Sequence, residues 1–295
     1  MPGSFAANGA RQPDPHAKNP ARRGNLLEHS RRLQTGTAIA HMAGMAWLLV
    51  RQAPIFCAML VGSAVLLLLP RLGAQSGARY QIETQTGRPG SLQERFSNSQ
   101  IALLEKLNRA DVEQLGQLRV LVVPASWDDE LSYSVLPLQY PASEAWPTFV
   151  VVHLPGQLFG AYQFGHLVRW GPVSSGGRNS PSSPGAFSLN WRSMGRASTV
   201  DPDWFMRWYF NFGNREGLAF HAYSLPGYPD SHGCIRLLER DAQWLFEWGQ
   251  SWVVDPAGDE VLEPGTPVLI MGRYDFDGPP PWRSLAWLSA TVELP

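Results

Sequence analysis

Short apolar runs alternate with turn-forming residues from Trp146 to Gly272, and this pattern constrains the fold more than any other feature of the sequence. Pro-Gly, single Gly and a Ser/Pro/Gly-rich interval over 174–185 separate the runs, as expected for strands joined by turns. Strands are predicted over 148–154, 157–164, 166–173, 186–192, 205–212, 217–223 and 268–272. A single clear helix is predicted over 237–248, ending before Gly249. We therefore expect residues 146–273 to form a mainly β domain, a β-rich α+β fold built as a mixed sandwich or sheet with one main helix.

The region before this domain, residues 75–145, has a different pattern. Residues 75–93 are polar and Gly-rich, which predicts a linker. Apolar spacing over 99–117 predicts two short amphipathic helices broken near Asn108, followed by a strand over 118–123. The Leu-Asn-Arg turn and the strand ending in Val-Pro resemble the second half of a LysM module; a small helical support for the main domain is the alternative. The Pro-rich and aromatic tail, residues 274–295, receives no predicted role.

The N-terminal part contains an uncharged run of 17 residues over 53–69, preceded by Arg51. Its length lies between that of a signal-peptide apolar region and that of a membrane span. We expect residues 53–74 to be a signal peptide or a membrane anchor, with contact to the membrane through 53–70 if it is uncleaved. Residues 1–52 are basic and polar, which predicts a disordered extension; Met42 or Met45 would begin a more ordinary signal sequence. Both interpretations export the body to the periplasm or cell envelope.

The charge distribution excludes one class of partner. The chain has 24 basic and 25 acidic residues, of which eight and two lie at or before residue 74, so the body carries a net charge of −7. Nucleic-acid binding needs a basic face that contacts phosphates. We therefore expect no nucleic-acid partner, and the early basic residues fit a role in membrane topology instead.

The chain has only two cysteines, Cys57 and Cys234. Cys57 lies in the predicted leader, so Cys234 has no partner for a disulfide in the exported body. Exported cysteines are usually paired, and an unpaired one is more often reactive than structural. Cys234 is therefore the candidate nucleophile.

A thiol becomes a strong nucleophile only when a base takes its proton. His221, at the end of a predicted strand, is the favoured base, because the side chain of His232 is expected to point away from Cys234 in so tight a turn. The amides of His232, Gly233 and Cys234 could form an oxyanion hole. A helix starting at Leu237 would also lower the thiol pKa through its N-terminal partial charge.

The segment from Phe220 to Leu237 contains a His, a loop and then Ser-His-Gly-Cys-Ile-Arg, and it resembles the L,D-transpeptidase catalytic domain, also called YkuD. The resemblance covers about residues 145–273. It implies that Cys234 is the nucleophile and His221 the general base, with an oxyanion hole and support from His232, Gly233 and Arg236. It also implies substrate contacts from Ser231, Tyr223 and Gly185. Two positions depart from the family pattern: Ala222 replaces a Gly after the base, and Pro184 is shifted by one residue.

The resemblance implies a substrate, the peptide stem of bacterial peptidoglycan, and a reaction that needs no cofactor or metal. The thiolate would attack the carbonyl of the diamino residue and release D-Ala, and the acyl group would pass to an amine in a cross-link or protein attachment. Hydrolysis by water, as in an L,D-carboxypeptidase, is one alternative, and a catalytically dead cell-wall-binding protein is another. Two further alternatives are a zinc site at His221, His232 and Cys234 and a papain-like peptidase, but the spacing and order of the residues do not favour them.

Overall fold

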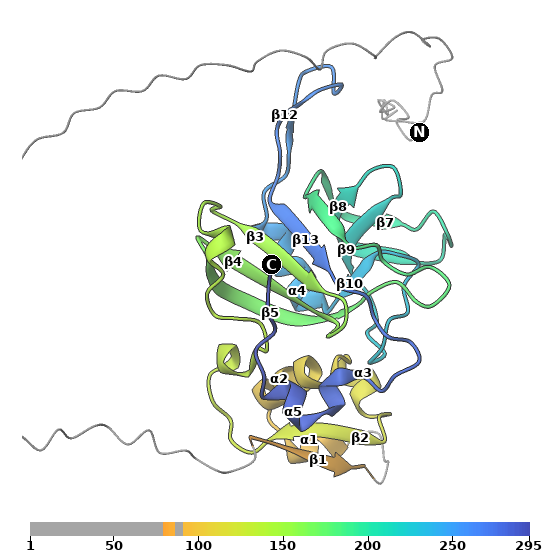
Figure 1. Ribbon diagram of the computed structural model, residues 1–295. Coiled ribbons are helices and arrows are strands. Elements are labelled where there is room, and N and C mark those ends of the chain that lie inside the picture. Colours follow the sequence, from red (N-terminus) through yellow and green to blue (C-terminus); the bar gives the residue numbers. More distant parts are fainter. Residues whose placement is uncertain (1–78, 86–90) are drawn as a thin grey trace, which may run out of the picture. The chain divides into compact units, whose positions relative to one another are not determined.

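The computed structural model describes residues 79–85 and 91–295 (Figure 1). The predicted extension over 1–52, the predicted signal or anchor over 53–74 and Cys57 lie outside these residues. Within the described ranges, no helix combines the length and the apolar character needed to span a membrane.

A nine-stranded sheet forms the main part of the described chain. Its strands, in spatial order, are β6 (Gly185–Ser188), β13 (Pro267–Met271), β3 (Phe149–His153), β4 (Leu158–Gln163), β5 (His166–Ser174), β10 (Ile235–Leu237), β9 (Leu218–Ala222), β8 (Phe205–Gly213) and β7 (Arg192–Ala197). Neighbours pair antiparallel except β3 with β13 and β9 with β10, which are parallel. The sheet curls so that its two halves enclose a shared core (Figure 1). The expected mainly β fold with few helices is confirmed.

The main core lies inside the curl and is closed by α4 (Glu239–Trp248). Alternate residues of each strand enter it, as the two-residue repeat of a strand requires. In β3, Val150 and Val152 face this core, whereas Val151 faces a second core on the outer side of the sheet. Burial on both faces explains why β3 reads as a continuous run of valines rather than as an alternating pattern.

A unit of two strands with three helices between them covers part of the outer face and is called the accessory unit below. It comprises β1 (Tyr80–Thr84), α1 (Ser91–Arg95), α2 (Asn98–Asn108), α3 (Val112–Leu115) and β2 (Val120–Pro124), with β1 antiparallel to β2. The two predicted helices broken near Asn108 are thus present as α2 and α3. The predicted linker over 75–93 is wrong at Tyr80–Thr84 and Ser91–Arg95, because that strand and helix complete the unit.

Buried polar groups join the accessory unit to the sheet. Lys106 Nζ donates to the carbonyl of Trp170 at 2.6 Å, and Arg109 Nε donates to the carbonyl of Gly156 at 2.8 Å. Glu105 of α2 pairs with Arg240 of α4. Buried donors that all find acceptors fix one relative orientation, since any shift would leave a charged group unsatisfied.

The C-terminal tail also packs on the outer face. It contains a short 3-10 turn (Pro281–Arg283) and α5 (Leu285–Leu288), and both Trp282 and Leu288 are buried in the second core. Two further 3-10 turns, Glu130–Tyr133 and Pro141–Ser143, lie between β2 and β3. A small hairpin of β11 (Val253–Val254) and β12 (Val261–Glu263) extends from the other end of the molecule (Figure 1).

Two predicted element boundaries are wrong. The strand expected over 186–192 is two strands, β6 and β7, which lie at opposite edges of the sheet. The chain crosses between them through Leu189, Asn190 and Trp191, where Leu189 is buried and Asn190 bonds Asn211 of β8. The helix expected from Leu237 begins at Glu239, because Ile235–Leu237 is taken into the sheet between β5 and β9.

Candidate active site

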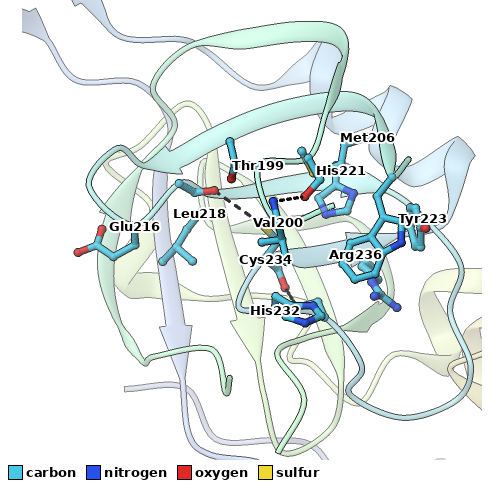
Figure 2. A pocket seen from close by; sticks show the side chains of 14 residues that line it. Thr199, Val200, Met206, Glu216, Leu218, His221, Tyr223, His232, Cys234 and Arg236 are labelled. Atoms are coloured by element: carbon cyan, nitrogen blue, oxygen red, sulfur yellow. Dashed lines mark hydrogen bonds between the residues drawn. The ribbon is translucent and has the colours of Figure 1, made fainter. Parts of the chain in front are cut away.

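The parallel pairing of β9 with β10 brings the candidate base and nucleophile together. Ile235 is aligned with Phe220 and Leu237 with Ala222, and all four side chains enter the main core. The alternate positions therefore face the other way, which places His221, Arg236 and Cys234 on one side of the two strands. All three line a single pocket. Figure 2 shows Cys234 near its centre, with Leu218 on one side and His221 on the other.

The turn that carries Cys234 has a conformation that requires glycine. Gly233 has φ of +110°, and a side-chain carbon at this position would lie 3.2 Å from Leu218 Cδ2. An L-residue is strained in this region of φ. The turn is held internally, because Ser231 Oγ donates to the Cys234 carbonyl and accepts from the Gly233 amide at 3.1 Å. Gly233 N–H is therefore engaged within the turn, so the predicted oxyanion hole must rely on the amides of His232 and Cys234.

A serine from the long loop between β5 and β6 supports the same turn. Ser182 Oγ donates to the Gly233 carbonyl at 2.8 Å and accepts from the Gly176 amide at 2.9 Å. Gly177 N–H donates to the Ser231 carbonyl at 2.8 Å. The sequence predicted this loop from composition, but nothing in its pattern distinguished Ser182 from the other serines around it.

His221 is buried, and its hydrogen bond determines which ring nitrogen can act as a base. Its Nδ1 lies 3.2 Å from the carbonyl of Ala222. A carbonyl only accepts, so Nδ1 carries the proton and Nε2 holds the free lone pair. Burial lowers the His221 pKa to about 4, with the bond to Ala222 opposing the shift and the charge of Arg236 adding to it. The imidazole is therefore neutral at pH 7, which is the form a general base needs.

Burial raises the pKa of the Cys234 thiol. A backbone hydrogen bond from Ala219 and the charges of Arg236 and Arg196 oppose this shift. Its Sγ lies 3.7 Å from the Gly217 carbonyl, which stabilises the protonated thiol. The predicted lowering of the pKa by a helix N-terminus is wrong, because β10 and Leu238 stand between Cys234 and the first turn of α4. The site is thus a neutral thiol beside a neutral imidazole.

Arg236 forms part of the pocket wall. It is buried, its Nη1 donates to Asp230 Oδ2 at 2.8 Å, and its guanidinium lies 4.8 Å from the centre of the Tyr223 ring. The sequence left open whether this arginine binds a substrate carboxylate or braces the turn through carbonyls. The structure shows a third arrangement, an ion pair with Asp230, in which the arginine still lines the pocket.

The remaining predicted site residues divide into two groups. Ser231, Tyr223 and His232 line the pocket, and His232 is exposed with its ring 5.1 Å from that of Trp204. Gly185 begins β6 and is not among the residues that line the pocket. The sequence did not indicate the loop between β7 and β8, which contributes Ser198, Thr199, Val200 and Trp204 to the pocket wall. No group of three His, Cys, Asp or Glu within the described ranges is arranged to hold a metal ion.

One comparison with known proteins identifies a family for part of the chain. Residues 147–270 match the model of the L,D-transpeptidase catalytic domain, YkuD. A search of curated proteins finds no match.

Three similar solved structures are L,D-transpeptidases. That from Stackebrandtia nassauensis has 23% identity, a TM-score of 0.35 and an alignment over 43% of this chain and 57% of that protein. One from Mycobacterium smegmatis has 18% identity and a TM-score of 0.34 over 43% and 59%, and one from Mycobacterium tuberculosis H37Rv has 19% and 0.33 over 43% and 58%. The chain thus spans less than two thirds of each. Cys234 and His221 both lie inside residues 147–270, the stretch that matches the L,D-transpeptidase catalytic domain.

Proposed function

We propose that the chain is a peptidoglycan L,D-transpeptidase that uses Cys234 as its nucleophile. The observation that supports this most directly is the pocket in which Cys234 lies beside His221, while the Ala222 carbonyl orients the imidazole. A nucleophile, a base and a group that orients the base are the parts that covalent acyl transfer requires. In the family, the substrate is the peptide stem of peptidoglycan, and we extend this to the present chain.

The proposed reaction begins with a coupled proton transfer. Both groups are neutral at pH 7, so His221 Nε2 removes the thiol proton as Sγ attacks the carbonyl carbon of the diamino residue. The new S–C bond produces a tetrahedral oxyanion, which the amides of His232 and Cys234 would stabilise. The C–N bond to D-Ala then breaks, and the departing amine takes the proton from His221. This leaves a thioester on Cys234.

The thioester then passes to an acceptor. His221 Nε2, again free of its proton, removes one from an attacking amine. The new C–N bond forms as the S–C bond breaks, and His221 returns the proton to the departing sulfur. An amine of a second stem gives a cross-link, and an amine of a protein gives attachment; water would give the hydrolytic, carboxypeptidase outcome. Peptidoglycan lies outside the cytoplasm, so the proposal includes export through residues 53–74 and, without cleavage, anchoring in the membrane.

The test is D-Ala release from tetrapeptide stems by the full chain. We expect release by the wild type and loss of at least about 10³-fold in Cys234→Ala, because no other thiol lines the pocket. Cys57→Ala is the matched control, since it removes the other thiol of the chain and should leave the rate unchanged. Equal release by wild type and Cys234→Ala would overturn the proposal.

The same assay identifies the acceptor and tests for a dead site. Adding a second stem with a free amine should convert hydrolysis products into cross-linked dimers, and mass spectrometry distinguishes the two. A chain that binds stems without releasing D-Ala would be a cell-wall-binding protein instead. Incubation with a carbapenem gives an independent readout, because ring opening leaves the whole molecule attached to Cys234 as a mass increase.

A further inference from the structure

The loop over 223–230 joins the strand of the base to the turn of the nucleophile. It leaves β9 one residue after Ala222 and reaches Ser231 directly after Asp230. At its start, Tyr223 lines the pocket, and at its end Asp230 pairs with Arg236. Arg236 in turn lies over the Tyr223 ring. The position of this loop therefore sets both the pocket wall and the charge that faces His221.

The middle of the loop is held by one carboxylate of the accessory unit. Asp111 Oδ2 accepts from the Leu225 amide at 2.7 Å and from Ser224 Oγ at 3.0 Å. The Asp111 amide donates back to the Leu225 carbonyl at 3.0 Å. Leu225 is fully buried, and its amide takes the Asp111 carboxylate as its acceptor. These three bonds tie the loop to the accessory unit.

Packing contacts beside Asp111 also join the loop to the accessory unit. Ala110 and Pro226 form an isolated bridge, and Gly227, with φ of +89°, lies against Asn108 and Leu118 of the accessory unit. Asp111 has a second task in its own unit, because its Oδ1 accepts from the Gln114 amide at 3.0 Å as the N-cap of α3. One side chain thus caps a helix with one oxygen and holds the loop with the other.

We propose that Asp111 is a positioning residue, through which the accessory unit holds the loop over 223–230 so that His221 stays dry and correctly placed beside Cys234. The proposal rests on the proposed function, since it concerns the same nucleophile and base. It gives the accessory unit a role in the chemistry. Release of the loop would separate Tyr223, Asp230 and Arg236 and admit water to the imidazole.

The test compares Asp111→Asn with Glu113→Gln in the full chain. Asparagine caps helices as well as aspartate, so α3 keeps its cap while an NH₂ group faces the Leu225 amide. Glu113 is exposed in the same short helix, and its replacement removes an equal charge without touching the loop. The readout is the rate at which a carbapenem acylates Cys234, followed by mass spectrometry from pH 4 to pH 8.

We expect Asp111→Asn to lower the plateau rate by about tenfold, because small displacements of reacting groups carry large costs. In the wild type, the acylation rate should fall on the acid side of the pH–rate profile, here called the acid limb, with an apparent pKa of about 4. We expect Asp111→Asn to move this apparent pKa up towards 6.5, because burial is the main cause of the low His221 pKa. A shift of one unit lowers the rate at pH 4.5, relative to the plateau, by about threefold. Glu113→Gln should match the wild type. Because a less stable variant would also unfold at a higher pH, the folded fraction is measured at each pH and the rate is expressed per folded protein.

Two further variants keep the outcome decisive. Asp111→Ala removes both oxygens, so a flipped asparagine amide cannot hide the effect, and Ser224→Ala removes one loop bond while leaving the α3 cap intact. Asp111→Ala should shift the acid limb at least as far as Asp111→Asn, and Ser224→Ala less far. If neither Asp111 variant moves the limb or the plateau, the positioning role is wrong.

The failure of this proposal is distinguishable from that of the proposed function. Wild type that is acylated by the carbapenem but releases no D-Ala from stems would overturn the substrate assignment and leave the Asp111 effect measurable. Wild type that is not acylated at all would overturn both, because there would be no reactive pair to position.

Discussion

The ends of β3 and β9 each carry a buried histidine, and the two differ in what they can do. Burial lowers the pKa of His153 and of His221 to about 4 in both cases, with an arginine charge contributing at each. Burial and pKa therefore do not distinguish them. At His153 the ring accepts, because Nδ1 takes the Gly156 amide at 3.0 Å. At His221 the ring donates, because Nδ1 faces a carbonyl.

The direction of this hydrogen bond determines which ring nitrogen keeps a free lone pair, and so whether the histidine can act as a base. His153 uses the lone pair of Nδ1 to close a turn, and its proton must sit on Nε2. His221 directs its proton to the backbone and keeps the lone pair of Nε2 for a ligand in the pocket. A buried neutral histidine is thus a candidate base only where a backbone acceptor holds the other nitrogen and a nucleophile lies beside it.

The largest expected effect is a difference in activity between variants of the two histidines. His221→Gln should lower the rate of D-Ala release and of carbapenem acylation by about 10²–10⁴-fold, the usual contribution of a general base. His153→Gln should change both rates by less than about twofold when measured on folded protein, because its ring faces a turn. Equal losses in the two variants would show that His221 acts through folding and not as a base.

In stability, by contrast, the two histidines should behave alike. Both have a pKa of about 4 in the folded chain against an ordinary value of 6.5, so the unfolded chain binds protons first as the pH falls. The free energy of unfolding should therefore decrease from pH 6.5 to pH 4, by about 1.4 kcal/mol per pH unit for each histidine. Urea unfolding at pH 7, 5.5 and 4.5 checks this.

The single variants sharpen this prediction. His153→Gln and His221→Gln should each remove about half of the histidine contribution to the slope, while only the second affects the rate. If the dependence of the free energy of unfolding on pH is unchanged in His153→Gln, then His153 takes up its proton as readily in the folded chain as in the unfolded chain.

The smallest expected effect concerns Ala222, whose carbonyl orients His221. Ala222→Gly restores the residue typical of the family, but the hydrogen bond to His221 comes from the backbone. The acylation rate should change by less than about threefold. Stability should fall by about 0.5–1 kcal/mol, since glycine loses more conformational freedom in a strand. A tenfold faster rate would show that the Ala222 methyl group limits the base.

The sequence was sufficient for most of the sheet and for choosing the proposed base and nucleophile, which line one pocket in the structure. Strands with a β-branched or aromatic run and a turn signal at each end, such as β3 to β5, were predicted within one or two residues. His221 and Cys234 were found because the motif and the strand that precedes it are local in the chain. The fold class followed from the same local patterns.

What the sequence did not show depends on contacts between distant residues. Ile235–Leu237 reads as the start of a helix, yet it pairs with β5 and β9 and becomes a strand, so the expected helix dipole is not at the thiol. Tyr80–Thr84 reads as a linker, because its partner β2 lies about 40 residues on. Ser182 and Trp204 carry no local signal, since each acts through a segment that the fold brings to it. Asp111 caps α3 locally, but its bonds to the loop over 223–230 depend on the fold in the same way.

The second core, on the outer side of the sheet, determines whether the matched domain can fold on its own. Trp170, Tyr162 and Leu167 of the sheet are covered by α2 and by the tail with Trp282, and Lys106 and Arg109 insert their charges there. A fragment cut at the boundaries of the recognisable domain, 147–270, would expose this apolar face and leave the carbonyls of Trp170 and Gly156 without the donors Lys106 and Arg109. Grafting that stretch into another protein should therefore give an aggregating product. The residues that match the family model are therefore only part of one cooperative folding unit, which also includes the accessory unit and the C-terminal tail.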